Sequence, residues 1–292
     1  MSAPIVLLAS YPKSGNTWTR LVLQALMKGG PVALNELNGD FHGFPRRVLF
    51  DDIAPINAAD LTPDEIDEWL PDVFAQFANE IDAPIFMKTH DAARRTPSGK
   101  WFMPPDNVHG VIHLVRHPFD VAVSYAKHMG KDVAWAIDVM GRENEMVTLG
   151  RDRLPPPLHE VIGSWSQNVC SWLSGSPYQV TTVRYEDMHE STFPTFQKIV
   201  AAVGFVASDA RIAMAIDATR FDKLREEERA VGFRERPRAS EAFFRSGKPR
   251  SWEGLLSDTQ RAGIFESHGK VMERLGYKAD GSYLPLSEAT FS

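Results

Sequence analysis

Short apolar runs alternate with amphipathic runs along most of this chain, and that alternation constrains the fold more than any other feature of the sequence. The apolar runs are as long as single strands and lie at 4–10, 83–90, 108–118 and 178–184. They do not alternate apolar with polar residues, so both faces of each strand are expected to be buried. Buried strands separated by helices predict an α/β fold, with a central parallel sheet flanked by helices.

Amphipathic spacing predicts helices at 17–29, 61–80, 119–129, 158–175, 193–205, 209–219 and 257–277. The second of these begins with a capping-box pattern, Thr62 followed by Glu65, with Pro63 at the first helical position. The segments that are expected to be loops or irregular lie at 38–47, 130–157 and 220–255.

The composition bounds the class of protein. A chain of 292 residues, 43% of them hydrophobic, is long enough for one large α/β domain or two small ones, and we expect a single domain over 1–292. The net charge of −6 makes nucleic acid an unexpected partner, so an anionic ligand must be held by local basic groups. The single cysteine, Cys170, excludes an internal disulfide and a cysteine-rich metal site.

The first ten residues could belong to a targeting signal or to a first strand. The start MSAPIVLLAS lacks a basic segment, and its apolar run extends only from Ile5 to Ala9. No run in the chain approaches the ~18 apolar residues of a membrane-spanning helix. We therefore expect a buried first strand, no membrane partner and a cytoplasmic location.

Four polar clusters follow the predicted strands, at 11–18, 88–90, 116–124 and 185–187. In open parallel sheets, ligands bind at the carboxyl ends of the strands. The clusters are therefore expected to meet at one edge of the sheet and to form the functional site.

The first cluster, in the stretch SYPKSGNTW, has the features of a phosphate-binding loop. Backbone N–H groups at a strand-to-helix junction are unpaired, and the helix dipole adds partial positive charge. Gly15 allows close approach of the backbone to a phosphate, and Ser14, Asn16 and Thr17 add side-chain donors. The alternative is an ordinary polar turn between a strand and a helix.

The place of the lysine separates this loop from the loop of ATP-binding proteins. The pattern GxxxxGK[ST] would put glycine at Ser10 and lysine at Asn16, whereas this chain has Lys13. No apolar strand clearly ends in an acidic residue that would hold Mg²⁺. The loop is therefore expected to bind a phosphate ester without a metal, with Lys13 reaching past the phosphate to the group being transferred.

The second and third clusters contain further candidates. His90 follows Lys88 at a strand end, and a histidine there can take a proton from a hydroxyl near neutral pH. Arg116 and Ser124 converge from a strand end and a helix face, and together they suit one phosphate group. The alternatives are a structural histidine, a surface salt bridge for Arg116 and a Ser124 hydroxyl bonded to its own helix.

Taken together, these motifs resemble the sulfotransferases that use 3′-phosphoadenosine 5′-phosphosulfate (PAPS). YPKSGNTW (11–18) resembles the family's 5′-phosphosulfate loop, and VRHPFDVAVSY (115–125) is similar to its 3′-phosphate motif. Three further stretches have counterparts in the family in the same order, namely KTH (88–90), YEDM (185–188) and FFRSGKPRSW (243–252). The resemblance covers about residues 5–255 and implies the P-loop nucleotide-kinase-like sulfotransferase fold.

The resemblance also implies a role for each candidate. His90 would remove the proton of an acceptor hydroxyl, and Lys13 would stabilise the oxygen that bridges phosphate and sulfate. Lys88 would neutralise the non-bridging oxygens, and Ser124 would hold Lys13 away until the acceptor arrives. The implied PAPS site needs no metal, yields 3′-phosphoadenosine 5′-phosphate (PAP) and comprises Lys13, Ser14, Gly15, Asn16, Thr17, Trp18, Arg116, Ser124, Tyr185, Thr219, Arg245, Ser246 and Gly247.

Some of these positions depart from the family pattern or have a second interpretation. Ser246 stands where the family has a lysine after its arginine, and RSW (250–252) replaces Gly-Asp-Trp; Lys248 or Arg250 is a candidate for the missing cation. Trp18, which the resemblance places near the adenine, has core packing as its alternative. The same alternative applies to Tyr185, and Thr219 belongs to a segment, DATRFDKL, that resembles a family segment near the base.

The acceptor is not identified by the sequence. Residues 35–50 and 130–157 are the expected acceptor lids, and residues about 220–255 are expected to cover the cofactor. The aromatic and apolar content of the lids favours a small aromatic or lipophilic hydroxyl compound. The predicted function is transfer of a sulfuryl group from PAPS to that hydroxyl, by in-line displacement with His90 as the base.

Two other functions stay open at this point, and so does the oligomeric state. One is a P-loop nucleotide-dependent kinase, against which the missing lysine after Gly15 argues. The other is a non-catalytic nucleotide-binding module, and the presence of both Lys88 and His90 favours an enzyme instead.

Overall fold

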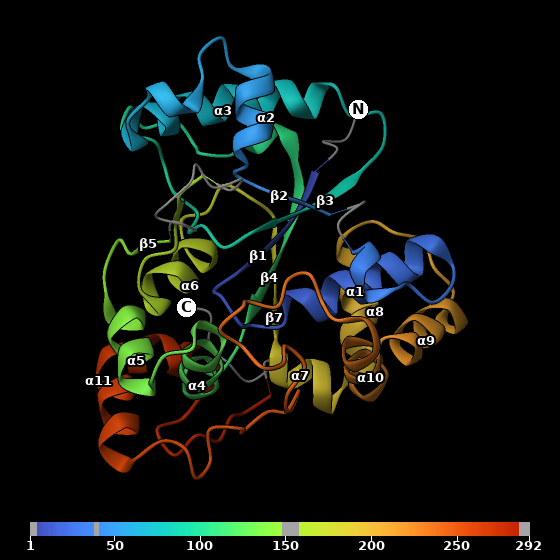
Figure 1. Cartoon of the computed structure of the whole chain (residues 1–292), viewed down its shortest axis with the longest axis vertical. Coiled ribbons are helices and arrows are strands. Elements are labelled where there is room, and N and C mark those ends of the chain that lie inside the picture. The colour runs from blue at the N-terminus through green and yellow to red at the C-terminus, as the bar shows by residue number, and fades with distance from the viewer. Residues whose placement is uncertain (1–4, 38–40, 148–157, 286–292) are drawn as a thin grey trace.

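The computed structural model describes residues 5–37, 41–147 and 158–285, and its centre is a five-stranded sheet (Figure 1). The strand order is β2-β3-β1-β4-β7, with bounds Phe41–Gly43, Ile85–Thr89, Ile5–Ser10, Val108–Val115 and Val180–Arg184. Each strand is parallel to its neighbours. The predicted strands and the predicted parallel α/β architecture are confirmed.

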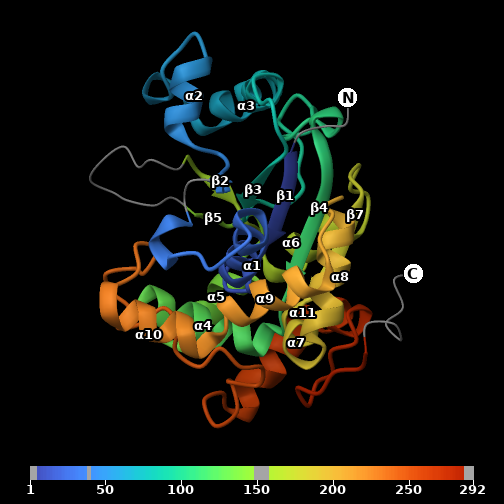
Figure 2. The same cartoon turned by 90° about the vertical axis from the view of Figure 1, so that its right-hand side faces the viewer.

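The side chains of β1 explain why helices cover both faces of the sheet. Val6 and Leu8 pack into one hydrophobic cluster, and Ile5, Leu7 and Ala9 pack into another, because successive residues of a strand point to opposite faces. The first cluster is completed by helices that face the viewer in Figure 2, α1 (Asn16–Lys28), α8 (Thr192–Ala202) and α9 (Asp209–Ala218). The second cluster is completed by α3 (Pro63–Asn79) and α6 (Trp165–Leu173).

Local signals in the sequence set the ends of these helices. The Glu65 carboxylate accepts from the Thr62 backbone N–H at 2.8 Å, and the Thr62 hydroxyl accepts from the Glu65 N–H at 3.4 Å, which is the predicted capping box of α3. Helix α1 ends at Gly29, which has a φ of 71°.

Two of the segments that were expected to be loops contain regular structure. Within 38–47, β2 pairs with β3 at the edge of the sheet and is followed by α2 (Arg47–Ile53). Within 220–255, α10 (Phe221–Val231) occupies the beginning. The loop predictions are wrong here because β2 is only three residues long, and because α10, although amphipathic, is rich in charged residues and begins a segment punctuated by glycine and proline.

The third such segment, 130–157, is also partly regular. Helix α5 (Val133–Gly141) begins after Asp132, whose side chain accepts from the Trp135 backbone N–H. A two-stranded antiparallel sheet then joins β5 (Met146–Val147) to β6 (Glu160–Val161), so the helix predicted from residue 158 starts only at Trp165. Residues 148–157 lie outside the described part of the chain.

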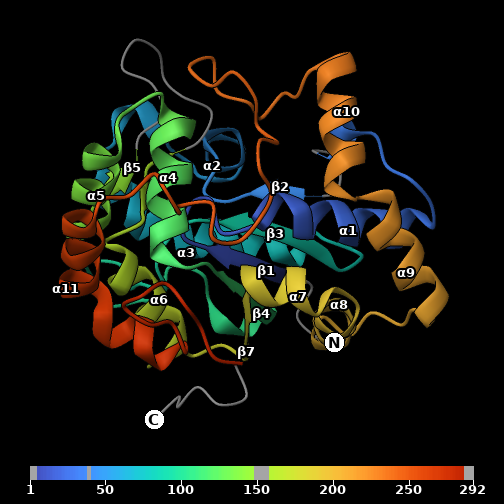
Figure 3. The same ribbon diagram turned by 90° about the horizontal axis from the view of Figure 1, so that it is seen from below.

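The remaining elements surround the sheet, and they are α4 (Pro118–Met129), α7 (Tyr185–Glu190), α11 (Asp258–Arg274) and short 3-10 helices at Leu34–Glu36, Ala58–Asp60 and Pro105–Asn107. Figure 3 shows the segment after α10 crossing back toward α4, where Ala239 lies against Gly130. Among the helices of the described residues, none is both long enough and apolar enough to span a membrane.

The strands of the central sheet end at a common edge. Ala9 is opposite Thr89, Ser10 is opposite Leu114, and Val115 is opposite the last residue of β7. The polar clusters at 11–18, 88–90, 116–124 and 185–187 therefore begin at one level, as the sequence predicts.

Candidate active site

A cavity of about 860 Å³ opens at this edge of the sheet. Every predicted site residue except Ser14 lines it, namely Lys13, Gly15, Asn16, Thr17, Trp18, Lys88, His90, Arg116, Ser124, Tyr185, Thr219, Arg245, Ser246 and Gly247. Of the two expected acceptor lids, the first contributes the stretch from Gly43 to Arg46. Of the second, none of the described residues 130–147 lines the cavity, and the remainder lies outside the described residues.

The phosphate loop is bent by two residues with positive φ. Lys13 has a φ of 71° and Gly15 a φ of 100°. A side chain at Gly15 would place its Cβ 2.8 Å from the ring of Tyr185, so the turn requires glycine. Helix α1 begins at the next residue, Asn16, and its first backbone N–H groups, which have no helical acceptor, lie at the cavity.

Two side chains that were predicted to donate to a ligand, Asn16 and Ser14, support the loop or are buried within it. Asn16 Nδ2 donates to the Leu8 carbonyl oxygen at 3.0 Å and to Ser10 Oγ at 3.2 Å, so it braces the loop against β1. The Ser14 side chain is fully buried and does not line the cavity. The sequence pattern could not separate side chains that support the loop from those that face a ligand.

An ion pair that is buried on its arginine side connects α1 to the segment after α10. Arg20 is 2% exposed, and its guanidinium donates to the Glu235 carboxylate at 2.6 and 2.8 Å. The Thr17 hydroxyl lies 3.5 Å from the same carboxylate and 3.2 Å from Arg20 Nη2. Glu235 also lines the cavity, so this pair fixes one of its walls. The sequence does not predict this pair, because nothing local indicates a partner 215 positions away.

Lys13 points toward α4. Its Nζ lies 3.2 Å from His128 Nδ1 and 4.3 Å from the centre of the Phe243 ring. Burial and the positive charges of Arg116 and Lys88 lower the pKa of Lys13 to about 7. The lysine is therefore close to losing its charge at neutral pH.

The hydrogen-bond partner of Lys13 is His128 rather than Ser124, which the resemblance implied. Ser124 lines the cavity one helical turn before His128 on α4. Residues at i and i+4 share a helix face, so this spacing could have identified His128 from the sequence.

His90 follows β3 and directs its ring toward the end of β1. His90 Nδ1 lies 2.7 Å from the carbonyl oxygen of Ser10. Because a carbonyl oxygen only accepts, Nδ1 carries the hydrogen and Nε2 carries the lone pair. Burial and the charge of Lys88 lower the pKa of His90 well below its usual range, so the ring is neutral. His90 lines the cavity, where Nε2 can accept a proton.

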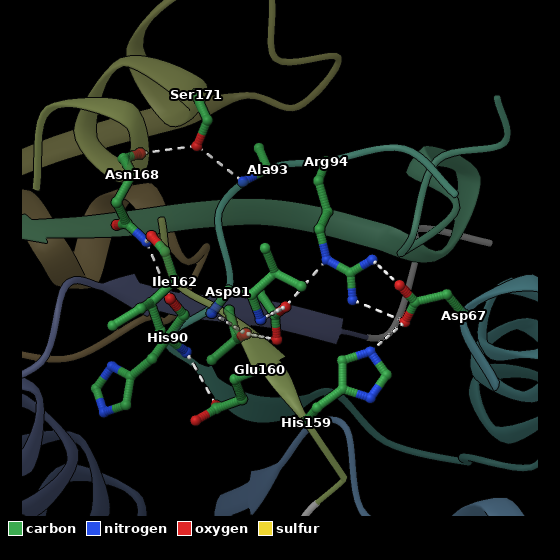
Figure 4. A network of polar contacts seen from close by, with 12 residues as sticks. Asp67, His90, Asp91, Ala93, Arg94, His159, Glu160, Ile162, Asn168 and Ser171 are labelled. Atoms are coloured by element: carbon green, nitrogen blue, oxygen red, sulfur yellow. Dashed lines mark hydrogen bonds and ion pairs between the residues drawn. The ribbon is translucent and has the colours of Figure 1, made fainter. Parts of the chain in front are cut away.

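A buried polar network holds the backbone around His90 (Figure 4). The Asn168 side chain on α6 donates to the His90 carbonyl oxygen at 3.0 Å, and Ser171 Oγ accepts from the Ala93 N–H at 2.8 Å. From β6, the Glu160 carboxylate accepts from the His90 N–H at 3.3 Å. The strand end is thus fixed by two elements outside the central sheet.

The charged part of this network surrounds Arg94. Arg94 donates to the Asp67 carboxylate at 2.6 and 3.0 Å and to Asp91 at 3.1 Å. His159 Nε2 lies 2.9 Å from Asp67. Burial raises the pKa of Asp91. In Figure 4 the His90 ring points away from these groups, so they support the strand end rather than face the cavity.

Lys88 lies two residues before His90, on the same side of β3, and lines the cavity. Burial lowers the pKa of Lys88, and the charge of Arg20 lowers it further. The carboxylates of Glu160 and Glu235 act in the opposite direction. The cavity therefore has two partly buried lysines, Lys13 and Lys88, beside a neutral histidine.

Arg116 connects three parts of the site. Its Nη1 donates to the Lys13 carbonyl oxygen and its Nη2 to the Lys248 carbonyl oxygen, each at 3.3 Å. The guanidinium lies over the ring of Tyr185, 4.1 Å from the ring centre. Asp120, in the first turn of α4, lies 3.8 Å from Nη2. Residues 243–252, called the late segment below, are thereby joined to the phosphate loop and to α7 around one cation.

The late segment is held against α4 and α10. The Asp120 carboxylate accepts from the Arg250 N–H at 2.8 Å, from Ser251 Oγ at 2.7 Å and from the Trp252 N–H at 3.1 Å. Gly247 has a φ of 58°, and a Cβ there would lie 2.1 Å from the ring of Phe221.

The two candidates for a replacement cation do not reach the cavity wall. The Arg250 guanidinium lies 2.7 Å from Glu253, and neither it nor Lys248 lines the cavity. Arg245 and Ser246 do line it. In this segment, Arg245 is therefore the cation at the wall.

Trp18 and Tyr185 line the cavity and contact each other edge to face, with ring centres 6.5 Å apart. Trp18 also packs on Phe196 of the core, at 5.4 Å between ring centres. The Thr219 hydroxyl donates to the Ala215 carbonyl oxygen at 2.8 Å, within its own helix. Trp18 therefore packs against the core and also lines the cavity.

Buried hydrogen-bonding groups near the phosphate loop lack a protein partner among the described residues. They include Ser14 Oγ, Trp18 Nε1 and Arg116 Nε. Trp18 and Arg116 line the cavity, and with the cations of Lys13 and Lys88 their unpaired N–H groups fit an anionic ligand. No group of three or more histidine, cysteine, aspartate or glutamate side chains that could hold a metal ion occurs in the part of the chain that the structure covers.

A central parallel sheet flanked by helices, with a glycine-containing turn between β1 and α1 at its carboxyl edge, defines this chain as an α/β protein. The family model described as "Sulfotransferase domain" matches residues 3–276. The chain therefore belongs to the sulfotransferase family, which confirms the resemblance found in its motifs.

Individual relatives are distant but similar over most of their length. Mouse sulfotransferase 1 family member D1 is 22% identical over 280 residues, which cover 92% of this chain and 83% of the relative. Dog sulfotransferase 1A1 is 25% identical over 278 residues, covering 93% and 84%. The solved structure of retinol dehydratase in a complex with retinol and PAP has a TM-score of 0.61 and 17% identity, and covers 94% of this chain and 82% of that one. The likeness at this identity shows a shared fold.

Proposed function

We propose that this protein transfers a sulfuryl group from PAPS to the hydroxyl of a small aromatic or lipophilic acceptor, with His90 as the general base. Membership of the sulfotransferase family supports the reaction class. The observation that carries the assignment of the base is the 2.7 Å contact between His90 Nδ1 and the Ser10 carbonyl oxygen. It leaves Nε2 as the proton acceptor in a cavity that also contains Lys13 and Lys88.

The proposed step is an in-line displacement. The acceptor oxygen forms a bond to sulfur, the bond from sulfur to the bridging oxygen breaks, and its electron pair remains on the phosphate oxygen of PAP. The acceptor proton moves to His90 Nε2. Lys13 stabilises the negative charge on the leaving oxygen, and Lys88 that on the non-bridging oxygens. The cation at Lys13 thus does what a metal does in many phosphoryl transfers.

The donor would be held along the edge of the sheet. The phosphate loop would bind the 5′-phosphate, and Arg116, with Ser124 and Arg245 beside it at the wall, would bind the 3′-phosphate. Arg116 is suited to this because its Nε is buried without a protein partner among the described residues. Trp18 and Tyr185 would lie against the adenine, and this assignment rests on their place at the wall.

The acceptor class is supported by the apolar part of the cavity wall. Its aromatic and aliphatic members include Phe44, Tyr125, Met129, Ile162 and Phe243. They would contact the body of the acceptor while its hydroxyl meets His90. A lipophilic ligand also occurs in this fold, since retinol dehydratase was solved with retinol and PAP.

The proposal is tested by incubating the protein with PAPS that is labelled in its sulfate and with a panel of hydroxyl compounds. The panel contains phenols, lipophilic alcohols and sugars. Transfer of label to phenols or lipophilic alcohols, and its loss in His90→Ala, is the expected result. Transfer to sugars alone would overturn the acceptor class.

The same preparation separates the two alternatives. Phosphate transfer from labelled ATP with Mg²⁺ would identify a kinase. Tight binding of PAP with no transfer to any compound of the panel would identify a binding module.

A further inference from the structure

Lys13 makes two side-chain contacts that a phosphate loop does not require. Its Nζ lies 3.2 Å from His128 Nδ1, in the last turn of α4, and 4.3 Å from the centre of the Phe243 ring, in the segment after α10. The His128 and Phe243 rings contact each other edge to face, with centres 5.9 Å apart. The three side chains therefore touch pairwise, and all three line the cavity.

The direction of the hydrogen bond follows from the chemistry of its two partners. An ammonium group only donates, so His128 Nδ1 accepts and the ring is neutral with its hydrogen on Nε2. Burial and the positive charges of Lys13 and Lys88 lower the pKa of His128 to about 3, which keeps Nδ1 an acceptor. His128 Nδ1 is therefore an acceptor for Lys13 at neutral pH.

The Lys13 ammonium needs such partners because its surroundings oppose its charge. Burial, followed by the positive charges of Arg116, Lys88 and Arg245, lowers its pKa, and the carboxylate of Glu235 alone acts the other way. A neutral acceptor and an aromatic face both favour the ammonium over the neutral amine.

Both partners are held by rigid elements. The Glu228 carboxylate on α10 accepts from the backbone N–H groups of Phe243 at 2.7 Å and Phe244 at 2.9 Å, which fixes the ring over Lys13. His128 belongs to α4, which ends at Gly130 with a φ of 63°. A lysine has a long flexible side chain, so its position depends on supports of this kind.

We propose that His128 and Phe243 are positioning residues that form a clamp on Lys13, hold its ammonium at the phosphate loop and preserve its charge for sulfuryl transfer. The clamp deepens the proposed function, because Lys13 stabilises the leaving oxygen only as a cation. It acts through Lys13 and touches neither the sulfur nor the oxygen that attacks it.

The test compares variants at His128 by a measurement that needs no turnover. The rate at which an amine-reactive reagent modifies Lys13 is followed by mass spectrometry as a function of pH in the free protein, and it gives the pKa of Lys13. His128→Leu is expected to lower that pKa by about one pH unit, since a hydrogen bond to a charged group is lost. His128→Asn is expected to keep it, because the Asn Oδ1 stands close to the place of Nδ1. His128→Gln, which mimics Nε2, is expected to behave like His128→Leu.

Two further variants complete the experiment. Phe243→Leu retains an apolar side chain but removes the aromatic face, so a smaller decrease in the pKa of Lys13 is expected. His109→Asn changes an exposed histidine at the start of β4 and is expected to have no effect. An unchanged pKa of Lys13 in both His128→Leu and Phe243→Leu would overturn the clamp.

Turnover then links the clamp to the reaction. With donor and acceptor saturating, kcat of His128→Leu is expected to fall about tenfold relative to the parent above the pKa that Lys13 has in the parent, and to approach the parent value below the lowered pKa that Lys13 has in the variant. A merely structural defect would lower kcat equally at every pH, and that result would contradict the clamp. If the labelling shows the expected shift but no hydroxyl compound accepts sulfate, the clamp stands and the proposed function fails.

Discussion

His90 Nδ1 lies 2.7 Å from the carbonyl oxygen of Ser10, and this contact joins the ends of two neighbouring parallel strands, β3 and β1. The backbone of one strand thereby determines which ring nitrogen of the next carries the hydrogen. Because Nδ1 is occupied, the lone pair of Nε2 is left for the cavity, so the pairing of the strands prepares the base before any substrate binds.

Replacement of His90 by alanine is expected to lower kcat for sulfuryl transfer by roughly 10²- to 10⁴-fold, because the acceptor proton then has no positioned base. PAP binding should stay close to that of the parent, since the phosphates are held by other residues. Labelled transfer and calorimetric PAP binding measure the two effects. His109→Ala, in an exposed histidine of β4, is the matched control, and retention of most of the activity in His90→Ala would remove His90 from the mechanism.

The lowered pKa of His90 makes a separate prediction about pH. The neutral ring is the active form, and burial moves its pKa well below the ordinary value of 6.5, so activity should be lost only at a pH well below that value. The transfer rate at saturating substrates is therefore expected to change little as the pH falls to 6.5. A rate that halves near that pH would mean that His90 has an ordinary pKa and that its ring is more exposed to solvent than the structure indicates.

Lys13 predicts a pH dependence of the opposite sign. Its pKa is lowered to about 7, so the ammonium is present below that pH and is lost as the pH rises through it. PAP affinity of the free protein should therefore weaken between pH 6 and pH 8.5, and Lys13→Met should have lower affinity with a flatter pH profile. Its kcat should fall by about two orders of magnitude, as expected for one electrostatic contact worth ~3 kcal/mol. Identical pH slopes in both proteins would exclude titration of Lys13.

Arg116 is expected to discriminate between nucleotides by their 3′ group. Arg116→Ala removes a charge-assisted contact, so affinity for PAP should fall by roughly 10- to 100-fold. Affinity for the 3′-hydroxyl analogue, adenosine 5′-phosphate, should fall far less. Equal losses for the two nucleotides would show that Arg116 supports the loop through the Lys13 carbonyl oxygen rather than binding the 3′-phosphate.

The sequence predicts the edge of the sheet well because buried strands and their polar ends are local features. It does not predict β2, a three-residue edge strand that exists through its pairing with β3, or α10, an amphipathic helix whose charged composition and Gly/Pro-rich surroundings are typical of a loop. Within the site, the positions of Lys13, His90 and Arg116 follow from spacing, and all three line the cavity.

What spacing cannot supply is the direction of a side chain or a distant partner. Asn16 and Ser14 are residue types that often donate to ligands. Asn16 instead donates to the backbone of β1, and Ser14 is fully buried. Arg20 and Glu235 meet only after α1 and the segment behind α10 are folded together. His128 is the exception, because its i to i+4 relation to Ser124 was readable on the helix face.

The Arg20–Glu235 pair is expected to be important for stability. Arg20 is 2% exposed, so Glu235→Gln leaves a buried cation with weaker compensation and should lower the free energy of unfolding by about 3 kcal/mol. Glu36→Gln, in the exposed pair of Glu36 with Lys28, is the control and should cost less than about 1 kcal/mol. Urea unfolding followed by circular dichroism gives both values. Equal effects would mean that the buried pair contributes no more than the surface one.

Gly247 offers a test of the late segment that needs no change of charge. It has a φ of 58°, and a Cβ there would lie 2.1 Å from the Phe221 ring, whereas Gly254 has a φ of 71° and open space around it. Alanine at either position carries a similar backbone cost, of about 1–2 kcal/mol. Only Gly247→Ala also forces the segment off α10, and because Arg245 and Ser246 precede it, the cavity wall must move.

Gly247→Ala should therefore be the less thermostable of the two alanine variants, and at a temperature where both are folded they should differ in ligand binding. PAP affinity is expected to fall at least tenfold in Gly247→Ala, since a misplaced Arg245 loses a charge-assisted contact, and to remain unchanged in Gly254→Ala. Calorimetric titration of the two proteins with PAP gives the comparison. If Gly247→Ala binds PAP as tightly as Gly254→Ala, the segment from 243 to 251 does not cover the nucleotide, and the 3′-phosphate would have to be held by Arg116 and α4 alone.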